Sequence, residues 1–201
     1  WPTALIPVLL KTQYAKNHRL SDIATVFTLH NISYQGEFPP ETLSLTGLDW
    51  SYFSPTQLSL NGKFNFLKAG VMFSDVLNTV SSAYRREVQS EKFGRGLEEM
   101  LRSRKDVFYS IRNGVDYEIW NPETDPHIVA KYSASNLKGK KKCKLDLIKE
   151  FGLSISSKTP LIGLVSYLSK QKGLDLLIEA MDELMEMKVG VVILGKGDEK
   201  Y

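Results

Sequence analysis

The sequence predicts an α/β protein with parallel strands, and three observations lead to that prediction. Short apolar runs typical of strands alternate with segments in which apolar residues recur at helical spacing. The clearest case lies in residues 161–194, where a strand, a helix and a second strand follow one another. The loops after the strands hold histidine, asparagine and lysine residues, and open parallel sheets bind their ligands at such loops.

The first half of the chain contains three predicted strands and one predicted helix. Apolar runs at residues 23–29, 76–80 and 107–111 predict the strands. Apolar residues between Phe64 and Met72 predict the helix, in which Gly70 allows close packing against a neighbour. The third strand is followed by Asn113-Gly114, a pair that favours a tight turn with a positive φ at the glycine.

The second half begins with an irregular segment, residues 116–135, whose closely spaced prolines exclude a regular helix. Beyond it we expect a helix at 140–151, a strand buried on both faces at 161–165, one helix over 174–185 and a strand at 189–194. The chain is therefore divided into a first domain at 1–113, an interdomain connection with its leading helix at 114–157, and the start of a second domain at 158–201.

Composition and charge are those of an ordinary globular protein. The hydrophobic share of 42% and the charged share of 24% argue for a packed core. The net charge of +3 comes partly from a lysine run at 138–142, a solvated helix end without the interleaved aromatic residues of a nucleic-acid site. No apolar stretch approaches the ~18 residues of a membrane span, and the single Cys143 allows no internal disulfide. We expect a cytoplasmic protein with no metal, nucleic-acid partner or membrane segment.

One candidate binding loop follows the first strand. His30 comes directly after it, and Asn31, Tyr34 and Gln35 follow. A neutral imidazole both donates and accepts, so it suits a sugar hydroxyl, but a histidine at a strand end is more often a structural hydrogen-bonder. Tyr34 adds a stacking surface and Gln35 an amide, which also suits a carbohydrate.

Further candidate loops flank the predicted helix of the second half. Lys172 lies where that helix opens, beside unpaired backbone N–H groups that attract phosphate. It is a candidate to stabilise a diphosphate leaving group, although a solvated loop explains the same residues equally well. After the last strand, the Gly-Lys-Gly-Asp of residues 195–198 lacks the third glycine of a dinucleotide fingerprint. Asn113-Gly114 is a further candidate, with a hinge turn as the simpler interpretation.

In order and spacing, these loops resemble those of the bacterial glycogen synthase and plant starch synthase family. The resemblance rests on seven short blocks, at residues 1–7, 30–36, 65–70, 78–81, 113–122, 171–173 and 194–198. Each block is weak singly, but seven in this order are not expected by chance. The resemblance identifies the chain as an internal fragment of such a protein.

The resemblance also implies a fold, an activity and a set of site residues. The fold would be α/β with two Rossmann-like domains facing each other, both incomplete here. The activity would be that of a retaining glycosyltransferase that moves glucose from ADP-glucose to the non-reducing end of an α-1,4-glucan, glycogen or starch, without a metal or other cofactor. The implied catalytic residues are His30 and Lys172, and the implied substrate-binding residues are Trp1, Asn31, Tyr34, Gln35, Asn113, Gly114, Tyr167, Gly195 and Gly197.

The chain departs from the family pattern at two positions that bear on activity. Tyr167 stands where the family has an arginine that shares the phosphate charge, and a phenol cannot replace a guanidinium. Pro2 stands where the family has a histidine near the acceptor. Two donor-binding loops of the family lie outside residues 1–201, so the fragment alone is expected to be inactive. Two alternatives stay open: a non-catalytic glucan-binding or regulatory paralogue, and another nucleotide-sugar glycosyltransferase of the same fold, such as a sucrose- or trehalose-type synthase.

Overall fold

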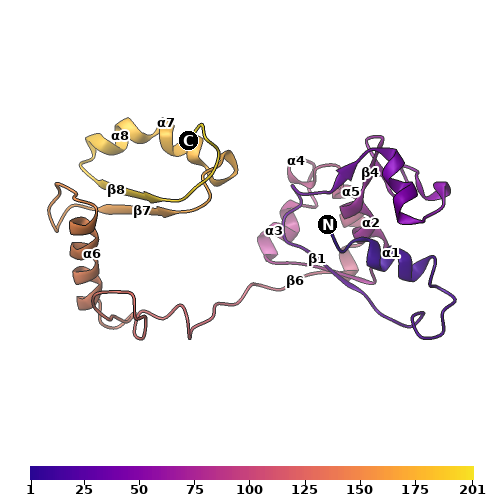
Figure 1. The fold of residues 1–201 in the computed structure, drawn as a ribbon, viewed down its shortest axis with the longest axis horizontal. Helices are drawn as coiled ribbons and strands as arrows, with labels where there is room; N and C mark the ends of the chain where they lie inside the picture. The colour runs from indigo at the N-terminus through magenta and orange to yellow at the C-terminus, as the bar shows by residue number, and fades with distance from the viewer. The chain divides into compact units, whose positions relative to one another are not determined.

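A computed structural model describes all of residues 1–201. The chain forms two compact units, Trp1–Gly114 and Val115–Tyr201 (Figure 1). Each unit contains parallel strands, with helices in the connections between them, so the predicted α/β class is confirmed. No helix combines the length and the apolar character that a membrane span requires. The further division of the second half at residue 157 stays a prediction.

The first unit is built on a parallel sheet of three strands, in the order β1 (Val26–Leu29), β5 (Val76–Thr79) and β6 (Phe108–Ser110). These three strands confirm the apolar runs of the sequence, with shorter bounds. Leu29 pairs with Thr79 and Thr79 pairs with Ser110, so all three strands end at the same edge. The other elements are α1 (Leu5–Lys11), β2 (Glu37–Phe38), β3 (Ser59–Leu60), β4 (Lys63–Asn65), α2 (Phe66–Phe73), α3 (Ser82–Glu87), α4 (Glu91–Gly94) and α5 (Glu98–Ser103), with 3-10 turns at Pro40–Thr46, Trp50–Tyr52 and Lys105–Val107.

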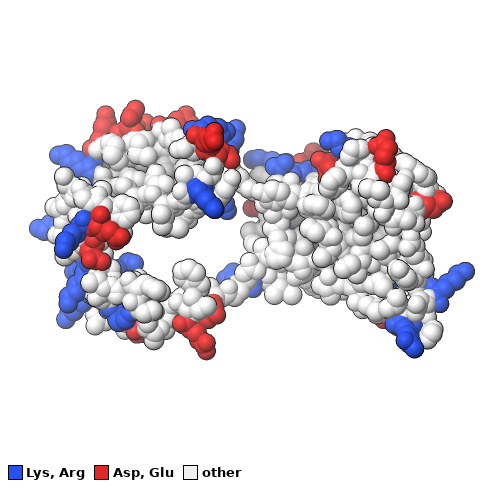
Figure 2. Space-filling model, in the orientation of Figure 1, with Lys and Arg blue, Asp and Glu red and all other residues white.

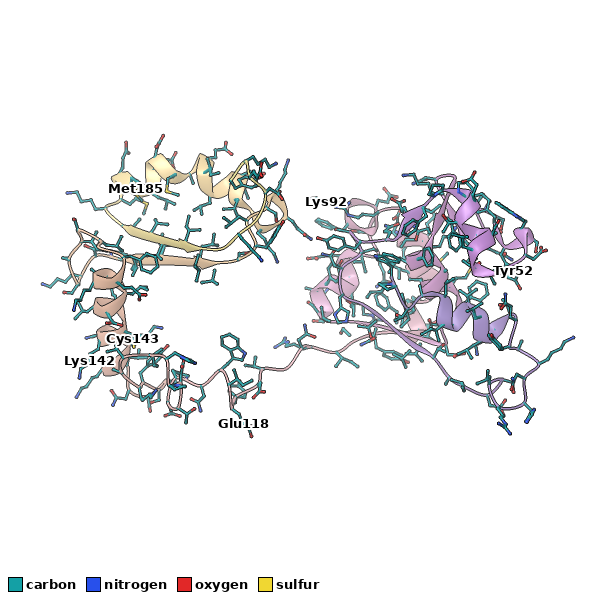
Figure 3. All side chains as sticks on the ribbon, viewed as in Figure 1. Tyr52, Lys92, Glu118, Lys142, Cys143 and Met185 are labelled. Carbon is teal, nitrogen blue, oxygen red and sulfur yellow. The ribbon has the colours of Figure 1, made fainter.

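Helix α2 packs directly on β1 because Gly70 has no side chain. A Cβ atom at Gly70 would lie 2.6 Å from Cε1 of Phe27, which is itself buried. The predicted close packing at Gly70 is therefore confirmed. Side chains fill the space between the sheet and its helices (Figure 3), and a second group of buried apolar residues lies around β4 and the turn Pro40–Thr46, namely Val8, Leu43, Leu48, Leu58, Phe64 and Ala69.

Two charged side chains fix the segment that joins α2 to β5. Arg104 donates to the carbonyls at the end of α2 and the start of the next segment, including that of Ser74 at 2.6 Å. Asp75 pairs with Lys11 at 2.8 Å and accepts hydrogen bonds from both the backbone N–H and the hydroxyl of Thr25. The hydrogen bond from Lys11, aided by those from Thr25, lowers the pKa of Asp75 from 3.8 to about 2.

The second unit contains α6 (Lys138–Glu150) and a parallel pair of strands, β7 (Leu161–Val165) and β8 (Gly190–Leu194). Between the strands lie a 3-10 turn, η4 (Lys170–Lys172), and the helices α7 (Leu174–Glu179) and α8 (Met181–Glu186). The helix predicted at 140–151 and both strands are confirmed. The single helix predicted over 174–185 is divided at Ala180, whose φ of −86° and ψ of −1° depart from ideal helical values. Basic side chains line α6 and acidic ones line α8 (Figure 2).

The prediction that the strand at 161–165 is buried on both faces is wrong. Ile162 is 36% exposed and Val165 is 80% exposed. The sheet of this unit has only two strands, and α7 and α8 lie along one side of it (Figure 1). The apolar run therefore shows that both faces of the strand are suited to burial. It does not show that other residues of the chain cover them.

The turn predicted at Asn113-Gly114 is also wrong. Gly114 is not among the residues with a positive φ, and residues 111–116 form no turn. An Asn-Gly pair makes a tight turn where a chain doubles back on itself. Here the chain leaves β6 and passes into the second unit, which begins at Val115, so the geometry that would need the turn is absent.

Candidate functional site

In the first unit, candidate residues gather in the loop that follows β1. His30 is the first residue beyond the strand, and its side chain is exposed with no hydrogen-bond partner in the chain. Behind it, the hydroxyl of Thr79 donates to the carbonyl of Leu29 at 2.6 Å, and that of Thr28 donates to Asn78 at 2.6 Å. These bonds tie the end of β1 to β5, so His30 begins at a well-anchored strand end.

The middle of this loop is folded by its own side chains. The side-chain oxygen of Asn31 accepts a hydrogen bond from the backbone N–H of Ser33 at 2.9 Å, which forms a local turn. The backbone N–H of Ile32 donates to the hydroxyl of Tyr84 on α3 at 2.8 Å. Tyr34 is 61% exposed. The loop thus presents His30 and Tyr34 to solvent, while the oxygen of Asn31 is used within the loop.

Gln35 differs from its neighbours because it is buried, with 8% of its surface exposed. Its side-chain oxygen accepts from Asn65 at 2.6 Å, and its nitrogen donates to the backbone carbonyl of Arg95 at 3.2 Å. Both ends of the amide therefore have partners inside the protein. The sequence indicated a substrate contact for Gln35, and the structure shows it linking three segments of the chain. The one sequence signal for a structural role of Asn65, the partner of Gln35, is its position just before a helix, where asparagine is a favoured N-cap residue.

Trp1 closes one side of the same region. Its ring lies over Gly36, whose φ is +64°, and a Cβ atom there would lie 2.5 Å from Cδ2 of the indole. The ring also contacts Phe38 and Phe66, with centroid separations of 5.4 Å in both cases. Trp1 is 38% exposed, so part of its apolar surface remains open to a ligand.

In the second unit, a cavity of about 510 Å³ lies at the carboxyl ends of β7 and β8. Its volume falls within the range of roughly 300–1,000 Å³ that small-molecule sites occupy. It is lined by Val165, Ser166, Tyr167, Leu194, Gly195 and Lys196. Tyr167 and Gly195 were predicted as binding residues. Ser166 and Lys196 were not, although they lie in the same two loops, and Lys196 supplies positive charge that an anionic ligand would need.

The glycines of the loop after β8 let it approach the loop after β7. A Cβ atom on Gly195 would overlap the carbonyl oxygen of Ser166, and one on Gly197 would overlap that of Leu168. Leu168 accepts from the backbone N–H of Asp198 and donates to the carbonyl of Lys196, each at 2.9 Å. Both glycines thus have a role in pairing the two loops, and their contact with a nucleotide stays a prediction.

Three predicted site residues lie apart from these groups. Lys172 is the last residue of η4, is exposed, and does not line the cavity beside Tyr167. Asn113 and Gly114 follow β6 and are exposed. Nothing lies within 4 Å of a Cβ atom built on Gly114. The structure gives these residues no partner that would fix them in a site.

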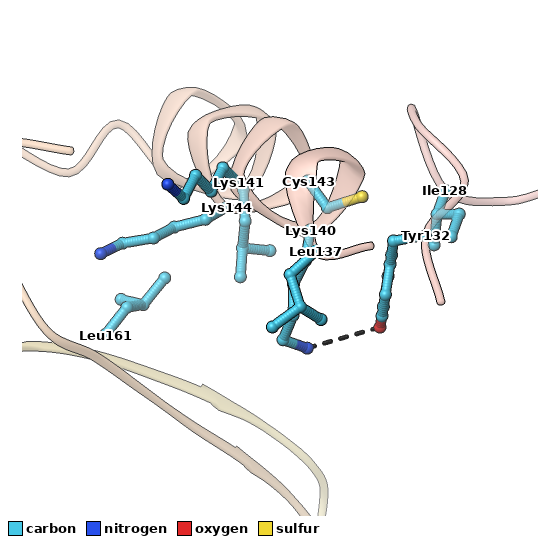
Figure 4. A pocket seen from close by; sticks show the side chains of 9 residues that line it. Ile128, Tyr132, Leu137, Lys140, Lys141, Cys143, Lys144 and Leu161 are labelled. Carbon is cyan, nitrogen blue, oxygen red and sulfur yellow. Dashed lines mark hydrogen bonds between the residues drawn. The ribbon is translucent and has the colours of Figure 1, made fainter. Parts of the chain in front are cut away.

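A second cavity, of about 490 Å³, lies between α6 and the segment before it and is lined by Lys140, Lys141 and Lys144 together with apolar residues (Figure 4). The ammonium of Lys140 is 3.4 Å from the hydroxyl of Tyr132. That of Lys144 donates to the carbonyls of Ser157 and Thr159. The ammonium groups of Lys140 and Lys144 point in different directions (Figure 4). They therefore form no convergent anion site, and they serve mainly to hold α6 against its neighbours.

The fold and the candidate site are those of an α/β protein that binds ligands at the carboxyl ends of its strands. Each unit is an α/β assembly whose polar loops lie at the carboxyl ends of parallel strands, and the second has a ligand-sized cavity there. Comparison with known proteins then identifies the family. Residues 1–103 match the family model described as the starch synthase catalytic domain. The chain belongs to that family.

Relatives extend the match to the rest of the chain. A glycogen synthase of Thermotoga petrophila is 47% identical over 201 residues, which are 100% of this chain and 41% of that protein. Glycogen synthase 1 of Geobacter metallireducens is 46% identical over 198 residues, 98% of this chain and 39% of that protein. The catalytic domain of starch synthase IV from Arabidopsis thaliana, bound to ADP and acarbose, matches with a TM-score of 0.89 and 34% identity, over 100% of this chain and 41% of that one. The chain thus spans about two fifths of the proteins that it matches.

Proposed function

We propose that this chain is part of a glycogen or starch synthase, with two Rossmann-like domains, that transfers glucose from ADP-glucose to the non-reducing end of an α-1,4-glucan with retention. The observation that carries the proposal is the cavity at the carboxyl ends of β7 and β8, in a chain of the starch synthase family. The names of the relatives support it, as does the starch synthase structure that binds ADP and acarbose.

The chemistry of the transfer assigns a role to each unit. The bond between the anomeric carbon and the diphosphate oxygen breaks, a bond to the acceptor hydroxyl forms on the same face, and the hydroxyl proton leaves with ADP. The departing diphosphate needs positive charge, which Lys196 beside the cavity and Lys172 on η4 can supply. His30 and Tyr34, exposed at the end of β1, supply a hydrogen-bonding group and an aromatic face for the sugar. No step in this scheme requires a metal.

The remaining candidate residues have binding roles in this scheme. Asn113 supplies an amide for the donor, with Gly114 beside it, and Trp1 offers its exposed indole surface to the glucan. Asn31 offers the nitrogen of its side-chain amide, since its oxygen is bonded to Ser33. Gly195 and Gly197 let the nucleotide approach the backbone of the loop after β8.

The test is whether the intact protein that contains residues 1–201 elongates glycogen. The reaction is monitored through the nucleoside diphosphate released from ADP-glucose and, in parallel, from UDP-glucose. We expect elongation with ADP-glucose, with no loss when chelator is present. Absence of elongation with both donors would contradict the proposal.

A second candidate function, a non-catalytic glucan-binding paralogue, is favoured by one observation. Tyr167 lines the cavity, and the resemblance to the family implies an arginine at this position. Tyr167→Arg separates the two functions: a guanidinium that stabilises the departing phosphate should raise kcat by about 10- to 100-fold. Tyr167→Gln, which adds polarity without charge, is the matched control and should not give this rise in kcat. If the protein binds glucan but neither it nor Tyr167→Arg transfers glucose, the paralogue is the correct function.

A further inference from the structure

A chain of four hydrogen-bonding groups crosses the interior of the first unit. The backbone N–H of Lys68 donates to the side-chain oxygen of Asn65 at 2.8 Å, and Asn65 donates to Gln35 at 2.6 Å. Gln35 in turn donates to the carbonyl of Arg95 at 3.2 Å. Asn65 is fully buried and Gln35 nearly so. The chain connects the N-terminus of α2, the loop after β1 and the segment between α4 and α5.

The direction of this chain is fixed by its two backbone ends. An N–H can only donate and a carbonyl can only accept, so the two amides between Lys68 and Arg95 have a single orientation that satisfies every bond. A side chain at position 35 must therefore accept on one side and donate on the other. Glutamine does both, and neither a carboxylate nor an apolar side chain of the same length does.

The backbone of the loop is anchored at the same place. Gln35 accepts at its carbonyl from the N–H of Leu67 at 2.9 Å, and Gly36 accepts from the N–H of Phe66 at 3.1 Å. At the other end of the loop, Ile32 is held by the hydroxyl of Tyr84. Between these anchors, the side chains of Ser33 and Tyr34 are exposed, and the exposed His30 lies just before Ile32. The loop is therefore rigid in its backbone while its polar side chains face solvent.

We infer that Gln35 is a positioning residue, which does not bind the substrate but holds the loop so that His30 meets the transferred sugar. The inference rests on the proposed function, because it assumes that His30 acts in the transfer. Holding a reacting group within a fraction of an ångström is a large part of catalysis, and a displacement of about 1 Å costs up to 100-fold in rate. Removing the amide leaves Asn65 and the carbonyl of Arg95 without their partner and weakens the anchorage of the loop at this end.

The test uses Gln35→Met in the intact protein, which preserves length and removes both hydrogen bonds. We expect kcat for glucosyl transfer to fall by about 10- to 100-fold, with a much smaller change in KM for ADP-glucose. In a His30→Ala background the same substitution should have little further effect on kcat, because the group it positions is gone. Gln89→Met is the matched control, since Gln89 donates to the carbonyl of Arg85 at 2.7 Å on another part of the unit.

Gln35→Glu gives an independent readout through pH. A carboxylate faces the carbonyl of Arg95 without a proton, whereas a protonated carboxyl accepts from Asn65 and donates to Arg95, as glutamine does. The ratio of Gln35→Glu to unmodified kcat should therefore rise as pH falls. The charged or titratable side chains on the three connected segments and their neighbours are present in both proteins, so their own titration is common to numerator and denominator; they are His30, Tyr34, Lys68, Tyr84, Arg95 and Glu98.

Hydrogen exchange distinguishes a failure of the proposed function from a failure of the positioning role. The amides of Ile32 and Leu67 should exchange faster in Gln35→Met and stay protected in Gln89→Met, whether or not the protein transfers glucose. If the unmodified protein shows no transfer, the proposed function fails, and the exchange result still tests the loop. If the unmodified protein transfers glucose and Gln35→Met has the same kcat, the positioning role is wrong. It is also wrong if Gln35→Met lowers kcat by the same factor in the His30→Ala background as in the unmodified protein.

Discussion

Replacement of Gly70 by alanine tests how tightly α2 packs on β1. Alanine favours a helix over glycine by about 1 kcal/mol, so an exposed site would be stabilised. At Gly70 the new methyl group would lie 2.6 Å from Cε1 of Phe27, a buried ring that belongs to the central core cluster. Forcing a methyl group into a packed core costs about 1–3 kcal/mol. We expect the packing cost to exceed the gain in helix propensity, so that Gly70→Ala lowers the free energy of unfolding by up to about 2 kcal/mol.

The measurement is urea unfolding followed by circular dichroism, with Phe27→Leu as the second arm of a double-mutant cycle. Leucine removes the ring atoms that the new methyl group meets, at a cost of about 1 kcal/mol by itself. In that background Gly70→Ala should become neutral or stabilising, which gives a coupling free energy of about 1–3 kcal/mol, the packing cost itself. Stabilisation by Gly70→Ala alone, or an equal loss in both backgrounds, would refute the argument from packing.

Two further substitutions test other contacts. Asp75→Asn should lower the free energy of unfolding by about 1 kcal/mol at neutral pH, because the pair with Lys11 is more than a third exposed and solvent screens it. Since the pKa of Asp75 is lowered from 3.8 to about 2, its contribution to stability is complete above about pH 4 and is lost as pH falls toward 2. Urea titrations at several pH values should show this loss with aspartate and not with asparagine. The same dependence of the unfolding free energy on pH in Asp75→Asn would contradict it. Gly197→Ala, which would overlap the carbonyl of Leu168, should speed hydrogen exchange of β7 and β8, whereas Gly163→Ala, with open space around it, should not; equal exchange in both would be the contrary result.

The sequence predicts best those features that depend on residues close together in the chain. The helix α6 and the strands β1, β5, β6, β7 and β8 all lie within their predicted ranges or within two residues of them. The close contact at Gly70 was also predicted, since a glycine within an amphipathic helix indicates a near neighbour. The neighbour itself, Phe27, was not, because it comes from a different strand.

The failures involve partners that are distant in the chain. The apolar pattern of residues 161–165 predicts burial on both faces, but whether a face is covered depends on other elements, and Val165 is 80% exposed here. The Asn-Gly pair at 113–114 favours a turn, but the path of the chain between the two units overrides that preference. Gln35 was interpreted as a ligand residue because its type suits a sugar, and that stays a prediction, but its hydrogen-bond partners Asn65 and Arg95, 30 and 60 residues away, were not predicted.

The two units hold their strand-end loops by different means, and the difference decides which substitutions each can accept. After β1, the loop depends on side-chain amides, so a change of hydrogen-bonding direction at Gln35 disturbs it, while its exposed side chains can change freely without loss of the fold. After β7 and β8, the loops pair through their backbones, and any side chain at Gly195 or Gly197 would meet a carbonyl oxygen. Tyr167 makes no such contact with its exposed ring, so Tyr167→Arg alters the charge of the cavity without disturbing the loops that form it. The arginine substitution at this position therefore tests function and not stability.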